Sequence, residues 1–181
     1  MHSIITVSGL SFEFSNGRQL FNNLSFSLES NVTALVGSNG VGKSSLAKLL
    51  TGELQPTEGT VRWHSSIVYF PQREMPKSLT VGEYLESGNF RSELGLKLLD
   101  GIERQRSCTQ LSGGQWMRVR LALIPTDQYL ILDEPTNDLD REGRIAVIKF
   151  LQNHPAGALL ISHDERFVEN CGVTTELVIG K

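Results

Sequence analysis

The chain has 181 residues, the usual size of a single domain and long enough to bury one hydrophobic core. Hydrophobic residues make up 39% and charged residues 20% of the sequence, which excludes intrinsically disordered and fibrous classes. The formal net charge of −3 gives no support to a dedicated DNA-binding or anionic-membrane-binding protein.

The N-terminal part of the chain is predicted to be mostly β-structure. Short runs rich in β-branched and aromatic residues indicate strands over 4–7, 11–14, 24–28, 32–36, 60–63 and 67–70. Residues 15–17 (Ser-Asn-Gly) predict a turn between two of these strands. A glycine-rich segment follows residue 36, and from Ser44 apolar residues recur at helical spacing until Gly52. The order there is strand, glycine loop, helix.

The second half alternates helices with short apolar strands. Thr80 and Glu83 form a capping-box pattern, and we expect residues 73–110 to be a small helical subdomain that glycines interrupt. The remaining expected elements are a helix over 113–124, a strand over 129–132, a helix capped by Asp140 with Ile145, Ile148 and Leu151 on its apolar face, and a strand over 158–161. The interrupting glycines are Gly88, Gly95 and Gly101. Such alternation predicts a mainly parallel sheet covered on both faces.

Several protein classes are excluded by what the sequence lacks. Apolar runs such as 158–161 are far shorter than the ~20 residues of a membrane helix, and the first residues do not resemble an export signal. Cys108 and Cys171 form no CxxC pair, so neither a disulfide framework nor a zinc site is indicated. We therefore expect a cytoplasmic protein without membrane insertion. The three histidines without motif context are expected at the surface: His2, His64 and His154.

A phosphate-binding loop is the most specific motif. Residues 37–44 satisfy G-x-x-x-x-G-K-[ST] between a predicted strand and a predicted helix, the context which that motif requires. Glycines let backbone N–H groups point at an anion, Lys43 adds a positive charge for the β- and γ-phosphates, and the Ser44 hydroxyl is placed to hold Mg²⁺. The expected ligand is a nucleoside triphosphate. The expected binding residues are Gly37, Ser38, Asn39, Gly40, Val41, Gly42, Lys43, Ser44 and Ser45.

An acidic pair ends the predicted strand over 129–132. Because ligands bind beyond the carboxyl ends of parallel strands, Asp133 and Glu134 should lie at the same edge as the phosphate-binding loop. Asp133 suits Mg²⁺, directly or through a water molecule. Glu134 should act on the attacking water as a base or as an orienting group.

A second anion-binding turn is indicated at Ser112, Gly113 and Gly114, at the N-terminal end of the helix predicted over 113–124. By itself this segment is better explained as a flexible helix N-cap. Its meaning depends on the other motifs.

Taken together, these motifs resemble the ATP-binding cassette (ABC) ATPases. The family's motifs occur here in order: Walker A at 37–44, the Q loop at Gln72, the signature at 111–115, Walker B at 130–133 followed by Glu134, the D loop at Asp140 and the switch His163. The resemblance implies an α/β fold of the P-loop NTPase type, with a mainly parallel sheet, an N-terminal antiparallel β part and a small helical subdomain. It also implies a single ABC ATPase domain over 1–181, with 1–72 and 111–181 as its nucleotide-binding core.

The resemblance assigns roles that composition does not show. Phe14 would stack on adenine, Gln72 would contact Mg²⁺ and the attacking water, and His163 would contact the γ-phosphate. Glu134, His163 and Gln72 are thus the expected catalytic residues, and Ser44, Gln72 and Asp133 the expected metal ligands. Ser112, Gly113 and Gly114 would complete the ATP site of a second cassette packed head to tail. ATP and Mg²⁺ are the implied ligands.

Within the family, the segments at 133–140 and 162–167 look like the ABC-F branch, whose members lack membrane domains and often act on ribosomes. This chain departs from the ABC-F pattern by having one cassette rather than two. Residues 73–108 carry six basic and six acidic residues, so no RNA-binding patch is visible there. Residues 115–133 are also about two residues short of the family pattern, which puts the pose of the signature in question.

The expected function is Mg²⁺-dependent ATP hydrolysis by a homodimer or by half of a tandem protein, with the ribosome as partner. Two alternatives stay open: the ATP-hydrolysing subunit of a membrane transporter, with a membrane subunit as partner, and a nucleotide-binding scaffold that does not hydrolyse ATP.

Overall fold

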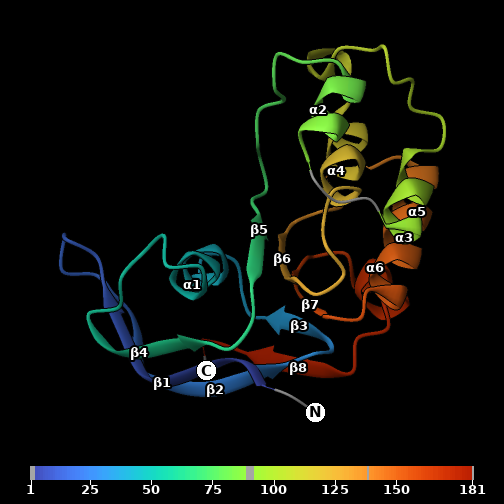
Figure 1. Ribbon diagram of the computed structural model, residues 1–181. Coiled ribbons are helices and arrows are strands. Elements are labelled where there is room, and N and C mark those ends of the chain that lie inside the picture. Colours follow the sequence, from blue (N-terminus) through green and yellow to red (C-terminus); the bar gives the residue numbers. More distant parts are fainter. Residues whose placement is uncertain (1–2, 89–91, 138, 181) are drawn as a thin grey trace.

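Two β-sheets form the framework of the protein in the computed structural model, which describes residues 3–88, 92–137 and 139–180 (Figure 1). An antiparallel sheet has the order β2-β1-β4, and a parallel sheet has the order β5-β6-β7-β3-β8. The predicted α/β class, with a mainly parallel sheet and an N-terminal antiparallel part, is confirmed.

The antiparallel sheet is built from β1 (Ser3–Glu13), which pairs with β2 (Gln19–Glu29) and with β4 (Glu58–Trp63). The runs at 4–7 and 11–14, expected as separate strands, are one strand. Its register shifts around Gly9, whose φ of +59° lets the chain bulge without breaking the ladder. The predicted turn at 15–17 is present, with the Gly17 N–H donating to the Phe14 carbonyl at 2.9 Å.

The parallel sheet consists of β3 (Val32–Val36), β5 (Ile67–Phe70), β6 (Tyr129–Asp133), β7 (Ala158–Ile161) and β8 (Thr175–Val178). Strands β6 and β7 are buried along their whole length, as expected for strands covered on both faces. Strand β8 was not predicted from the sequence.

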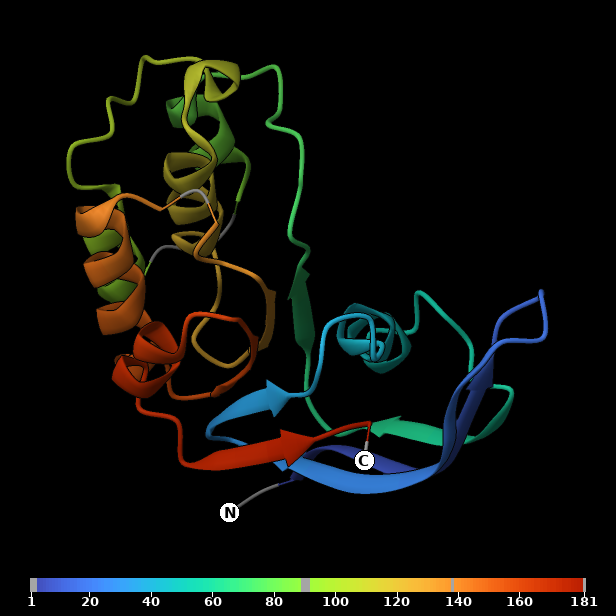
Figure 2. The ribbon, with the colours of Figure 1, turned by 180° about the vertical axis from the view of Figure 1, so that it is seen from behind.

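The two faces of the parallel sheet contribute to different cores because alternate side chains point to opposite faces. One core contains Ile131 and Leu159 and is closed by the antiparallel sheet and α1 (Lys43–Leu50). The other contains Leu130 and Leu160 and is closed by α4 (Gly113–Leu121), α5 (Arg141–Asn153) and α6 (Glu165–Asn170). Figure 2 shows the helices of the second core standing on the side of the sheet opposite α1.

The section between β5 and α4 contains α2 (Val81–Ser87), α3 (Glu93–Leu96) and the 3₁₀ turns η1 (Lys97–Leu99) and η2 (Cys108–Gln110). The predicted capping box is confirmed: the Glu83 N–H donates to Thr80 Oγ1 at 3.2 Å and the Thr80 N–H donates to Glu83 Oε2 at 2.7 Å. Gly95, expected as an interruption, lies inside α3. A Cβ there would come within 2.4 Å of the Ala122 carbonyl oxygen, so this glycine permits close helix packing.

Two further expectations were wrong. Ile145, expected on the apolar face of α5, is 45% exposed, because that face is formed by Val147 and Phe150 together with Leu151, which is buried as expected. His154, expected at the surface, is only 5% exposed: its ring stacks on Phe150 and its Nε2 lies 2.7 Å from the Gln128 carbonyl oxygen. His64 is exposed as expected, and His2 lies outside the described residues.

No helix in the described part of the chain is long and apolar enough to cross a membrane.

Candidate functional site

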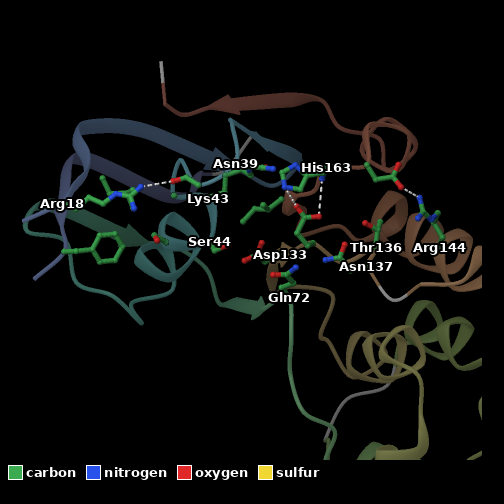
Figure 3. Close-up of a pocket in the computed structure, with 18 residues that line it drawn as sticks. Arg18, Asn39, Lys43, Ser44, Gln72, Asp133, Thr136, Asn137, Arg144 and His163 are labelled. Carbon is green, nitrogen blue, oxygen red and sulfur yellow. Dashed lines mark hydrogen bonds and ion pairs between the residues drawn. The ribbon is translucent and has the colours of Figure 1, made fainter. Parts of the chain in front are cut away.

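A cleft of about 1070 Å³ lies where the carboxyl ends of β6 and β7 meet the N-terminus of α1 (Figure 3). It brings together most of the site residues predicted from the sequence: Phe14, Asn39, Gly40, Gly42, Lys43, Ser44, Ser45, Gln72, Asp133, Glu134 and His163. These residues come from segments separated by up to 149 positions, and the fold alone brings them to one place.

The glycine loop leaves the start of α1 open toward a ligand. Gly42 occupies the N-cap position with φ of +108° and has no side chain, so within the described part of the chain no N-cap side chain satisfies the first N–H groups of the helix. Gly40 has φ of +76°, and the space where its Cβ would lie is open. Unpaired N–H groups at a helix N-terminus form an anion-binding site.

Lys43 lies over this loop and is only 8% exposed. Its ammonium donates to the carbonyl oxygens of Gly37 at 2.8 Å and Ser38 at 3.1 Å. These contacts hold the charge against the loop, where a phosphate group on the N–H groups would also lie. Gly37 and Ser38 therefore do not line the cleft, and their carbonyl oxygens accept hydrogen bonds from Lys43 instead. Val41 packs toward Gly180.

Asp133 is the last residue of β6 and is 5% exposed. Its Oδ2 accepts a hydrogen bond of 3.1 Å from the Tyr69 hydroxyl on the neighbouring strand β5. Burial, and then the charge of Asp133, raise the pKa of Tyr69 above its usual value, so the hydroxyl stays protonated and remains a donor. The hydrogen bond fixes one carboxylate oxygen and leaves the other available.

Glu134, the next residue, has a left-handed backbone conformation with φ of +51°. Its N–H donates to the Ile161 carbonyl oxygen at 2.7 Å, and this hydrogen bond stabilises that conformation. Its carboxylate faces the turn after β7. His163 Nε2 lies 3.1 Å from Oε1, and the His163 N–H donates to Oε2 at 3.4 Å. Burial raises the pKa of the Glu134 carboxyl, while His163 lowers it. A carboxyl whose pKa is raised in this way is a better proton acceptor than an exposed glutamate.

The turn at Ser112–Gly114, expected to bind an anion, lies next to the main cleft rather than in it. Gly113 and Gly114 line a neighbouring cavity of about 480 Å³, and Gln72, Asp133 and Glu134 line both spaces. Ser112 caps α4 in a capping box with Gln115, since Ser112 Oγ accepts from the Gln115 N–H at 3.2 Å and Gln115 Oε1 accepts from the Ser112 N–H at 3.1 Å. The glycine loop and this turn thus lie at separate places on one chain.

The residues around the cleft fit a polyphosphate with Mg²⁺. Ser44, Gln72 and Asp133 offer a hydroxyl, an amide and a carboxylate, which are the hard oxygen ligands that Mg²⁺ prefers. Among the described residues no group of three His, Cys, Asp or Glu side chains could hold a metal. One carboxylate with substrate phosphates is the usual way in which proteins hold Mg²⁺.

Other residues that line the cleft were not predicted from the sequence: Arg18, Leu20, Thr136, Asn137, Arg144 and Asp164. The contact of Tyr69 with Asp133 was not predicted either. Arg18 Nη2 lies 3.5 Å from the Gly40 carbonyl oxygen. Arg144 looks like any polar residue on an amphipathic helix. Nothing local in the sequence indicates that it faces the cleft.

Comparison with known proteins shows clear similarity. A family model described as "ABC transporter" matches residues 21–137. The chain is 36% identical to ATP-binding cassette sub-family F member 2 of Bos taurus over 92% of this chain and 29% of that protein. It is also 36% identical to the probable ATP-binding protein YbiT of Escherichia coli O157:H7, over 97% of this chain and 37% of that protein. The chain thus spans well under half the length of these curated relatives.

Solved structures give the same result for the fold. An inward-facing ABC transporter of the metal-chelate type matches with a TM-score of 0.77 and 25% identity, over 99% of this chain and 81% of that one. A bacterial Atm1-family ABC exporter with ATP bound matches with a TM-score of 0.79 at 21% identity, over 98% of this chain and 37% of that one.

Proposed function

The chain belongs to the ABC family, and from that premise we propose that its cleft binds ATP with Mg²⁺ and hydrolyses it to ADP and phosphate. One observation carries the proposal: the open N-terminus of α1 with Lys43 lies in the same cleft as Asp133, Glu134 and His163. Phosphoryl transfer to water needs groups that hold the phosphates and a residue that positions the attacking water. The glycine loop with Lys43 is suited to the first role and Glu134 to the second.

Binding is assigned to the glycine loop and its surroundings. The N–H groups at the start of α1 and the Lys43 ammonium would hold the β- and γ-phosphates, and Phe14 would stack on the adenine. The ammonium would exchange its carbonyl contacts for phosphate oxygens. Ser44, Gln72 and Asp133 would hold Mg²⁺, which when bound would neutralise phosphate charge.

Hydrolysis is assigned to Glu134. Its carboxylate would orient the attacking water and accept its proton, which the raised pKa favours. His163 lies against this carboxylate and would contact the γ-phosphate. Gln72, at the junction of the two cavities, would contact the metal and the water.

The test is phosphate release by Glu134→Gln. We expect turnover to fall at least ~100-fold while ATP affinity, measured by titration with a fluorescent analogue, stays within about threefold. Glu169→Gln, the same change on an exposed residue of α6, is the control. Undiminished phosphate release by Glu134→Gln would refute the catalytic assignment, and an unchanged ATP affinity of Lys43→Ala would refute the phosphate cradle.

We further propose that this cassette pairs head to tail with a second one, which is either another copy of this chain in a homodimer or the other half of a tandem protein. Separation of the Ser112–Gly114 turn from the glycine loop supports this, because the turn would complete the site of the partner cassette. Sedimentation of Glu134→Gln with and without ATP tests the pairing: a monomer under both conditions would exclude a homodimer.

We propose a cytoplasmic role at the ribosome from the resemblance of segments 133–140 and 162–167 to the ABC-F branch, and the sub-family F relatives support membership of that branch. Work as a transporter subunit is the second candidate, favoured by the fold likeness to a solved transporter. Co-sedimentation of the protein with ribosomes would support the first candidate, and co-purification with a membrane subunit would support the second. A scaffold that does not hydrolyse ATP is the third, and the phosphate-release assay decides it.

A further inference from the structure

An ion pair joins two segments at the rim of the cleft that the proposed mechanism does not use. Arg144, in the first turn of α5, contacts Asp164 through its Nη1, and both side chains line the cleft (Figure 3). The side chains are 35% and 27% exposed, so the pair is partly shielded from water. Arg144 thus connects α5 to the turn that follows β7.

That turn carries His163, whose own packing is weak. The His163 side chain is 56% exposed, and it contacts Glu134 through Nε2 alone, while the His163 backbone N–H donates to the other carboxylate oxygen. The position of a largely exposed side chain is determined mainly by the position of its backbone. The placement of His163 is therefore set by what holds the residues on either side of it.

On one side, Ser162 follows β7, and its hydroxyl lies 3.5 Å from Thr136 Oγ1. On the other side, Asp164 caps α6 by accepting from the Phe167 N–H at 2.9 Å, while its own N–H donates to Ser162 Oγ at 3.2 Å. Both of these Asp164 contacts lie within three residues, and they join the turn to itself and to α6, which the buried Phe167 anchors in the core. Of the Asp164 contacts described, only the one to Arg144 reaches a separate helix.

We propose that Arg144 is a positioning residue that holds the turn at Ser162–Asp164 so that His163 lies against Glu134. The inference rests on the proposed hydrolysis of ATP for its catalytic consequence, but its structural consequence exists without any nucleotide. The two consequences can be measured separately.

The structural test is hydrogen exchange of the peptide covering residues 162–166 in the nucleotide-free protein. A partly exposed ion pair is weak, so we expect Arg144→Gln to speed exchange about two- to fivefold. Arg144→Lys should retain most of the protection because it keeps the charge. Arg141→Gln, which removes an exposed arginine from the same helical turn, should leave the exchange unchanged. Unchanged exchange in Arg144→Gln overturns the proposal, whether or not the protein hydrolyses ATP.

The catalytic test is a double-mutant cycle between Arg144 and His163. Arg144→Gln should lower kcat two- to fivefold with little change in KM, and Arg144→Lys should restore it. In a His163→Ala background the same substitution should cause no further loss, because the group that Arg144 positions is gone. Losses that multiply independently would overturn the proposal. Absence of hydrolysis by the wild type would refute the proposed function and leave the exchange experiment to decide the role of Arg144.

Discussion

Replacing Tyr69 by phenylalanine removes one hydroxyl group that donates to a buried carboxylate. Tyr69 lies on β5, and its O–H to Asp133 Oδ2 distance is 3.1 Å. Asp133 is 5% exposed, so water cannot readily replace the lost donor. The substitution keeps the ring and its packing, and it leaves one oxygen of a charged group without its partner.

The magnitude follows from this geometry. A hydrogen bond to a charged group contributes about 1.5–3 kcal/mol to the free energy of unfolding, and the 3.1 Å distance is long for an O–H donor. We therefore expect a loss of about 1.5 kcal/mol, which lowers Tm by about 3–6 °C in a chain of this size. The Mg²⁺ concentration that gives half-maximal ATP hydrolysis should also rise, because the carboxylate is no longer fixed.

Urea unfolding followed by circular dichroism measures the first effect, and phosphate release against Mg²⁺ concentration measures the second. Tyr84→Phe is the control, since Tyr84 is a half-buried tyrosine that packs on Trp116 in the helical part. The reasoning fails if Tyr69→Phe is as stable as Tyr84→Phe, because the hydroxyl would then contribute nothing to the folded state.

Two further predictions follow from the caps and from a buried histidine. Ser112→Ala and Thr80→Ala each remove a capping box, and each should lower the free energy of unfolding, measured in urea, by about 1 kcal/mol. Only Ser112→Ala should also reduce ATP hydrolysis. Equal ATPase activity of the two variants would contradict a role for Ser112 in a partner site. Burial lowers the pKa of His154, so the unfolded chain binds its proton first and stability should fall as the pH drops below about 6.5. His154→Gln should weaken this fall in urea titrations between pH 7.5 and 5.5, and an unchanged pH dependence would show that the ring is not the group that titrates.

Much of the fold was predictable because its signals are local. The strand over 32–36, the glycine loop and the capping box at Thr80 depend on residue types a few positions apart, and the structure has all three. Gly95 and His154 were misjudged for the opposite reason. Their surroundings are the Ala122 carbonyl and the Gln128 carbonyl, which belong to other segments of the chain.

The sequence by itself determined which chemical groups this protein offers to a ligand: a glycine loop with Lys43, an acidic pair and a histidine in a recognisable order. Only the tertiary structure decided how these groups are supported, through Tyr69 on Asp133 across 64 residues and Arg144 on Asp164 across 20. The physical reason is that backbone conformation and capping depend on neighbouring residues. Contacts between distant segments depend on strand order and helix packing, which no single segment encodes.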